Sequence, residues 1–124
     1  MDAALLLLPS HDFIAYDDER MIRTTDAVRE ELDENGLLRR YRQDDGLGDE
    51  GAFLACSFWL AECLANQRRV QDARDVFDRA LETANDLGLF AEECDPRTGE
   101  LLGNFPQALT HLSHISAAVA LSSD

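Results

Sequence analysis

The chain has 124 residues, of which 45% are apolar, and its 25 acidic and 11 basic side chains give a formal charge of −14 at pH 7. This length and composition predict one folded domain with a modest core. The strong negative charge argues against nucleic acid and anionic membrane surfaces as partners, because both are bound through a cationic footprint.

The three cysteines are expected to be reduced and buried. Cys56 and Cys63 would lie roughly 10 Å apart on one helix, too far for a disulfide, and Cys94 leaves an odd count without CxxC spacing. This usage is typical of cytoplasmic proteins. The apolar run near the N-terminus is too short to span a bilayer and lacks the basic residues of a signal peptide. No spacing of ligand residues predicts a metal or a cofactor.

Apolar spacing predicts an all-α protein of five helices, in chain order 3–8, 18–35, 50–66, 70–87 and 105–121. Pro9 ends the first helix, and Gly36 follows the second where a positive φ can close it. The third helix is apolar nearly all round, which indicates burial on most sides. The fourth has one apolar stripe and a charged outer side. No strand is expected, because the extended-looking segment 37–43 would have no partner.

The loops indicate where a site would be built. The third and fourth helices are separated by residues 67–69 alone, so we expect them to be antiparallel neighbours. The loops 36–49 and 88–104 are long, and alternating helices would bring both to the same end of the bundle. Within the second loop, Asp95 to Gly99 reads "DPRTG", a turn that would hold the preceding residues in a defined shape.

Glu92 and Glu93 are the candidate catalytic residues of that loop. Adjacent carboxylates are most often a solvated charge run, but these stand between an apolar tripeptide and a fixed turn. A carboxylate at the mouth of an apolar pocket can be tuned as a general base. On the other long loop, Arg40 and Tyr41 would be either surface residues or ligands for vicinal sugar hydroxyls.

Three further residues have two interpretations each. Glu50, at the start of the third helix, would either complement the helix dipole or line the pocket. His111 and His114 stand three residues apart on the fifth helix. We expect them to be packed or hydrogen-bonded, because the sequence offers no further ligands at zinc spacing.

Two long segments resemble a known enzyme family. The stretch "DEGAFLACSFWLAECLA" (49–65) and the stretch "ANDLGLFAEECDPRTGELLGNFPQALTHL" (84–112) are similar to glycoside hydrolase family fifteen, the glucoamylase-like enzymes. The opening "DAALLLLP" and the loop "LLRRYRQDDGL" fit the same family. The resemblance covers the whole chain but corresponds to the C-terminal third or so of a family catalytic domain.

The resemblance implies antiparallel helical hairpins forming part of an (α/α)6 barrel, and inverting hydrolysis of α-glucosides such as maltodextrins, isomaltodextrins or trehalose, as in glucoamylases, glucodextranases and trehalases. By the motif match, Glu92 would be the general base and Arg40 would bind glucose hydroxyls. Tyr41, Glu93 and, more weakly, Glu50 complete the expected substrate-binding set. Inversion also needs a general acid, and no segment of this chain resembles the family's acid motif.

Two alternatives remain open at this stage. The third and fourth helices have roughly the spacing of one tetratricopeptide unit, which would make the chain a binding module, although such solenoids generally need three or more units. The chain could also be a non-catalytic remnant of the hydrolase. An incomplete barrel would expose apolar flanks of the third and fifth predicted helices, so we expect self-association or association with the missing N-terminal part.

Overall fold

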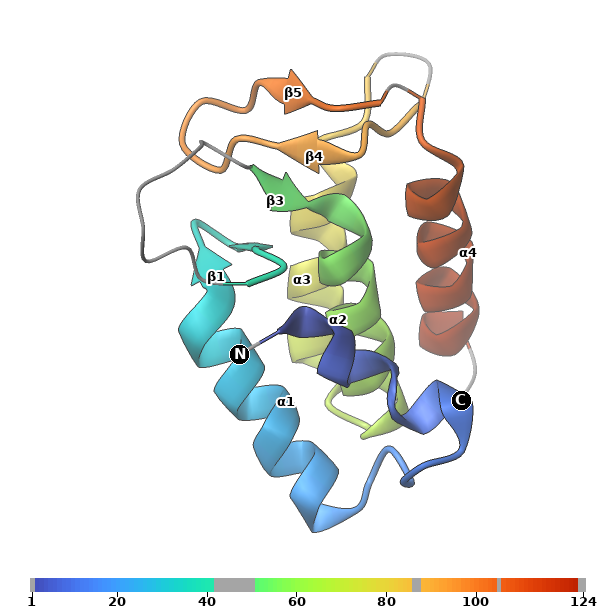
Figure 1. Cartoon of the computed structure of the whole chain (residues 1–124). Coiled ribbons are helices and arrows are strands. Elements are labelled where there is room, and N and C mark those ends of the chain that lie inside the picture. Colours follow the sequence, from blue (N-terminus) through green and yellow to red (C-terminus); the bar gives the residue numbers. More distant parts are fainter. Residues whose placement is uncertain (1, 42–50, 86–87, 105, 123–124) are drawn as a thin grey trace.

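The computed structural model describes residues 2–41, 51–85, 88–104 and 106–122 (Figure 1). The described chain is mainly helical, as predicted. Its elements are, in order, the 3-10 helices η1 (Ala3–Leu7) and η2 (Pro9–His11), α1 (Glu19–Leu32), β1 (Asp33–Glu34), β2 (Leu37–Leu38), β3 (Ala52–Phe53), α2 (Leu54–Asn66), α3 (Val70–Leu81), β4 (Glu93–Cys94), β5 (Leu101–Leu102) and α4 (Ala108–Ser122).

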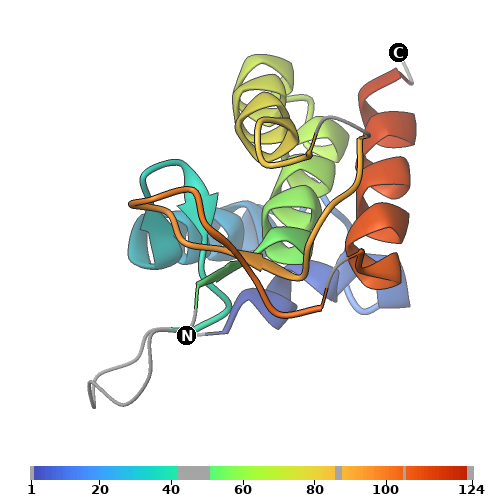
Figure 2. The ribbon, with the colours of Figure 1, turned by 90° about the horizontal axis from the view of Figure 1, so that it is seen from above.

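Helix α2 is the centre of the fold. It packs against α3 and α4, and the two partners lie on different sides of it (Figures 1 and 2). Leu54, Phe58 and Leu64 on α2 are completely buried, as its nearly continuous apolar sequence predicted. The short connection at 67–69 makes α2 and α3 an antiparallel hairpin, which confirms the expected neighbours.

Helix α1 covers a third side of the core with one face. Asp18 begins it by accepting a hydrogen bond from the Arg20 N–H at 2.9 Å, as a helix-capping residue does. Its buried residues, Met21, Thr25, Val28 and Leu32, recur at helical spacing. The opposite face is charged and exposed, which explains why this helix was readily predicted.

The expectation of no strands was wrong. Antiparallel β3, β4 and β5 form a sheet that crosses the end of the bundle where α2 begins (Figure 1). Antiparallel β1 and β2 form a hairpin through Asn35 and Gly36, whose φ angles of 52° and 83° suit a tight turn of the type I′ class. Each strand has two residues, too few to produce an alternating pattern in the sequence.

The strands and turns also shorten the helices relative to prediction. The second predicted helix ends at Leu32 because Asp33 and Glu34 pair with the next strand. The third begins at Leu54 because Ala52 and Phe53 pair with β4. The other differences are that the first helix is a 3-10 helix, the fourth ends at Leu81 and the fifth begins at Ala108.

The hairpin between β4 and β5 is firmly fixed, as the DPRTG turn predicted. Asp95 donates its backbone N–H to the carbonyl of Glu100 at 2.8 Å, and Gly99 donates to the Asp95 carbonyl at 2.8 Å. The side-chain amide of Asn35 donates to the Pro96 carbonyl at 2.7 Å. This last bond joins the two hairpins, although they are far apart in the sequence.

Helix α4 is buried on one side only. Its buried residues are the small Thr110, Ser113 and Ala117. Its other side exposes large apolar residues, namely Leu109, Leu112, Ile115 and Val119, with between 54% and 64% of each residue accessible. The apolar flank expected for the fifth predicted helix is therefore present. The one expected for the third is not observed, because none of the large exposed apolar residues in the described chain lies on α2. Within the described part of the chain, none of the helices has the length and apolar content of a membrane span.

Candidate active site around Glu92

Glu92 lies in the segment that leads into β4, at the end of the bundle where α2 begins. Its backbone N–H donates to the Asn104 carbonyl at 2.9 Å. Its backbone carbonyl accepts a hydrogen bond from the N–H of Leu54, the first residue of α2, at 3.0 Å. Both backbone groups of Glu92 are therefore bonded to segments far from it in the chain.

The two residues before Glu92 are held by the first turns of α4. The Phe90 N–H donates to Nε2 of His111 at 3.1 Å, and the Phe90 carbonyl accepts from the Gln107 N–H at 2.9 Å. The hydroxyl of Thr110, which is buried, donates to the Ala91 carbonyl at 3.0 Å. The segment that carries the carboxylate is thus fixed by its main chain, as an exact catalytic geometry requires.

The carboxylate of Glu92 is half-buried and held by side-chain amides. Its Oε2 accepts a hydrogen bond from Gln107 Nε2 at 2.9 Å and a longer one from Asn104 Nδ2 at 3.5 Å. Its Oε1 lies beside Gly103, where an added Cβ atom would stand 3.0 Å from that oxygen. The amide donors on one oxygen fix the orientation of the carboxylate.

An apolar hollow adjoins this segment. Its volume is about 480 Å³, and it is lined by Leu89, Pro106, Ala108, His111 and Leu112, at the beginning of α4. Behind the segment, the ring of Phe90 packs edge-on against Phe58, with centroids 5.3 Å apart. Glu92 is not among the residues that line this hollow, so the pocket mouth expected around its carboxylate stays a prediction.

The two histidines of α4 are packed and hydrogen-bonded, as expected. Nε2 of His111 accepts the Phe90 N–H, so the ring proton of the neutral imidazole is on Nδ1. His114 stacks on Phe77, with centroids 5.4 Å apart, and also contacts Phe58. Burial, and then the nearby His111, lowers the pKa of His114. Among the described residues, no group of three His, Cys, Asp or Glu side chains could hold a metal ion.

Glu93 has different surroundings from Glu92. It belongs to β4, where it lies opposite Phe53 of β3 and Leu102 of β5. Its Oε1 is buried. Glu93 is therefore a half-buried residue of the middle strand of the sheet, whereas the Glu92 carboxylate lies against Gly103, Asn104 and Gln107.

Arg40 and Tyr41 lie beside the N-terminal segment. The Arg40 carbonyl accepts the Ala3 N–H at 2.7 Å, and its guanidinium Nε is 3.9 Å from Asp2 Oδ1. Tyr41 forms a β-bridge with Asp2 and is 39% exposed. The charge of Arg40 acts on the thiol of Cys56 in the first turns of α2.

The structure thus brings the predicted site residues only partly together. The Arg40 segment and the Glu92 segment both reach the N-terminal half of α2. Within the described part of the chain, no hydrogen bond or ion pair links the side chains of Arg40 and Glu92. Glu50 lies outside the described residues.

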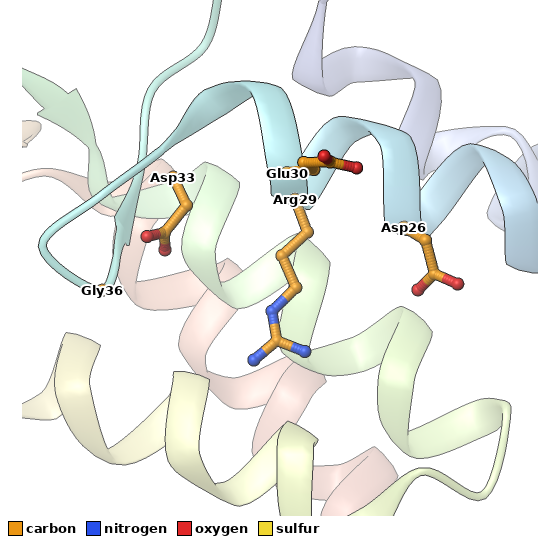
Figure 3. Close-up of a pocket in the computed structure, with 5 residues that line it drawn as sticks. All are labelled: Asp26, Arg29, Glu30, Asp33 and Gly36. Atoms are coloured by element: carbon orange, nitrogen blue, oxygen red, sulfur yellow. The ribbon is translucent and has the colours of Figure 1, made fainter.

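A second hollow, along α1 and the hairpin that follows it, is lined mostly by charged residues (Figure 3). Its volume is about 510 Å³, and it is lined by Asp26, Arg29, Glu30, Asp33 and Gly36. Arg29 reaches across toward the neighbouring helices and pairs with Asp72 of α3 at 3.5 Å. Asp26 pairs with Arg69, next to α3, at 2.7 Å. We interpret these ion pairs as contacts between α1 and α3.

Sequence reasoning missed three residues that surround the Glu92 carboxylate: Gly103, Asn104 and Gln107. Asn104 and Gln107 stand at the start of the fifth predicted helix, and no role was predicted for either of them. The sequence feature that could have pointed to them is a glycine and two amide residues that follow a candidate base. What they contact could not be deduced, because it depends on where α4 docks.

Comparison with known proteins gives consistent matches along the chain. Residues 1–73 and 65–119 match the family described as "Glycosyl hydrolases family 15". Trehalase from Thermoplasma volcanium is 50% identical over 123 residues, which are 98% of this chain and 20% of that protein. Trehalase from Mycolicibacterium smegmatis is 48% identical over 123 residues, covering 96% of this chain and 18% of that protein.

A solved structure titled "Glycosidase Wild Type" has the same fold, with a TM-score of 0.83 and 21% sequence identity. It covers 98% of this chain, whereas this chain covers 36% of it. At this identity the likeness establishes the fold alone. The chain spans about one fifth of the length of the curated relatives that it matches.

Proposed function

This chain belongs to glycosyl hydrolase family 15, and from that premise we propose that it is the C-terminal part of an (α/α)6-barrel catalytic domain of the trehalase type. Its single domain, residues 1–124, would supply some of the barrel's helical hairpins. The proposal is supported by the coverage of the matches, which extend over nearly all of this chain and about one fifth of each trehalase.

The reaction would be hydrolysis of an α-glucoside, with trehalose as the first candidate because the similar proteins are named trehalases. Glu92 would be the general base that takes a proton from the attacking water. An inverting enzyme places a second carboxyl group, the general acid, roughly 6.5–9.5 Å from the base. That acid would come from a part of the barrel outside this chain.

The observation that carries this proposal is the fixation of Glu92. Hydrogen bonds to Leu54, Asn104 and Gln107 hold its main chain and one carboxylate oxygen, and its other oxygen faces an exposed glycine. A carboxylate in a solvated charge run would not need such support. A base has to be held, because small displacements from the reacting water cost rate steeply.

Four further residues would bind the sugar. Arg40 is a half-exposed guanidinium and Tyr41 an exposed phenol, and both groups can hydrogen-bond vicinal hydroxyls. Glu93 would act from within the sheet, next to the base. Glu50, between Tyr41 and α2 in the sequence, completes the proposed set.

The exposed face of α4 would be the contact with the rest of the barrel. Helix α4 contains no charged residue, although the chain as a whole has a charge of −14. Large exposed apolar patches on a soluble protein usually mark an interface. We expect this face to pack against another helix of the barrel. In its absence, two copies of the chain would associate through it.

The test measures glucose release from trehalose, maltose and a dextrin. The chain is assayed alone and mixed with the upstream part of the catalytic domain of a family 15 trehalase. The wild-type chain is compared with Glu92→Gln, and Glu100→Gln, an exposed carboxylate on the same hairpin, is the control. We expect turnover in the mixture that Glu92→Gln abolishes and Glu100→Gln preserves. Equal turnover by the two variants would refute the base assignment.

The interaction-module alternative predicts no turnover in any mixture. No observation on the fold favours it, because the sheet β3–β4–β5 across the end of the helices is not part of a helical-hairpin repeat. A non-catalytic remnant would likewise give wild type and Glu92→Gln the same result.

A further inference from the structure

We propose that the two oxygens of the Glu92 carboxylate have different tasks. Oε2 is the anchor, held by Gln107 and Asn104, and Oε1 is the oxygen that takes the proton of the attacking water over Gly103. This inference rests on the proposed role of Glu92 as the general base. It makes Gln107 a positioning residue and Gly103 a residue that keeps one oxygen accessible.

The orientation of the Gln107 amide follows from the start of α4. Gln107 directly precedes the helix, and its side-chain Oε1 accepts the N–H of Leu109 in the first turn at 3.5 Å. Its backbone N–H is bonded to the Phe90 carbonyl at 2.9 Å. With the amide oxygen directed to the helix, the amide nitrogen faces Glu92 and donates to Oε2 at 2.9 Å.

Asn104 holds the same oxygen from a second direction. Its carbonyl accepts the Glu92 N–H at 2.9 Å, and its side-chain Nδ2 is 3.5 Å from Oε2. Both donors thus converge on Oε2. With two amide donors on it, Oε2 is already occupied, and a proton would have to displace one of them.

Gly103 leaves the other oxygen accessible. Gly103 is exposed, and a Cβ at this position would lie 3.0 Å from Oε1 and 3.1 Å from the Cβ of Glu92. Any larger residue would therefore cover Oε1. The backbone also favours glycine here, since its φ is +75°. Gly99 on the same hairpin has a φ of +78° with nothing within 4 Å, so it offers a matched control for backbone strain.

The chemical step is then balanced as follows. The water oxygen forms a bond to the anomeric carbon while one water proton passes to Oε1 of Glu92. The bond from the anomeric carbon to the glycosidic oxygen breaks, and that oxygen takes a proton from the general acid. Oε2 keeps its hydrogen bond to Gln107 throughout, so the carboxylate does not rotate as it becomes protonated.

The anchor is tested first on the 124-residue chain itself, without substrate. The side-chain amide signals of Gln107 are followed by two-dimensional ¹H–¹⁵N NMR and assigned through their loss in Gln107→Met. We expect them to shift in Glu92→Gln and to stay in place in Glu100→Gln. Gln107 signals that do not respond to Glu92→Gln would overturn the anchor, whether or not Glu92 is the base.

The kinetic test uses the active mixture and trehalose. Gln107→Met should lower kcat by about tenfold to a hundredfold and leave KM within about twofold, since the displaced base still permits substrate binding. Gln107→Glu, which keeps a helix-favouring residue before α4 but loses the donor, should show the same loss and move the acid limb of the rate profile to higher pH. An unchanged kcat in both variants would overturn the positioning role.

Gly103→Ala decides which oxygen accepts the proton. Its kcat should fall at least about tenfold below that of Gly99→Ala, because both variants carry the same backbone strain but one alone covers Oε1. Equal kcat values would refute the assignment of Oε1. Should Glu92→Gln itself retain full turnover, the proposed function fails, and the NMR result still reports on the contact independently.

Discussion

Replacing Phe58 by alanine tests the core beneath the site. Phe58 is fully buried, and its ring lies 5.7 Å from Phe77, 5.3 Å from Phe90 and 5.4 Å from His114. Phe→Ala changes in a core cost about 3–5 kcal/mol. We expect the upper half of this range, because the three rings come from different segments and cannot readily collapse into the cavity.

A loss of about 4 kcal/mol is large for a domain of this size, since typical stabilities are about 5–15 kcal/mol. It should lower the Tm by roughly 10–20 °C. Urea unfolding followed by circular dichroism measures the loss directly. Val70→Ala at the exposed start of α3 is the control and should change the free energy of unfolding by no more than about 0.5 kcal/mol. A loss below about 1 kcal/mol in Phe58→Ala would refute the described packing.

Three further predictions concern titration, thiol reactivity and sheet packing. Burial lowers the pKa of His114 below the ordinary 6.5. As pH falls, the unfolded chain therefore takes up this proton before the folded chain does. The stability that the neutral ring contributes should be lost as pH falls below about 6.5. Urea midpoints at pH 8 and pH 5 should therefore differ less in His114→Phe than in wild type, and an equal difference would contradict this. Burial raises the pKa of Cys56 and of Cys63 to about 12. Neither thiol should therefore react with a disulfide reagent at pH 8 before urea unfolds the chain. Rapid labelling of the native protein would contradict this prediction. Gly51→Ala should destabilise the protein by about 1–3 kcal/mol, because the new Cβ would lie 2.7 Å from the Cys94 carbonyl oxygen. An unchanged urea midpoint would contradict this, since it would mean that the sheet shifts to make room at no cost in stability.

The helices were predictable because their cause is local in the sequence. The buried residues of α1 recur at helical spacing, and α2 is apolar on nearly every side, as a central helix must be. The strands were not predictable, since two residues carry no alternation and their pairing joins Ala52 to Cys94. That pairing also moved the start of α2 from the predicted residue 50 to Leu54.

The candidate site, too, has a part that the sequence predicts and a part that it does not. The pair Glu92 and Glu93 could be singled out from the apolar residues before it and the turn after it, which are local features, whereas the choice of Glu92 as the base came from the resemblance to the family motif. The hydrogen bonds of Glu92 with Gln107 and Leu54 depend on tertiary packing of two helices. A sequence pattern can therefore propose a base, but it cannot say which oxygen is held. The roles of Arg40 and Tyr41 stay predictions.

The bond between Leu54 and Glu92 has a consequence for how the protein folds. Helix α2 begins after Phe53, which makes no side-chain cap, and the Glu92 carbonyl takes the N–H of its first residue instead. The first turn of the central helix is thus completed by a residue far downstream. During synthesis this helix end must wait until the Glu92 segment has left the ribosome. Such a non-local closure slows folding, and it ties the start of the central helix to the segment that carries the candidate base.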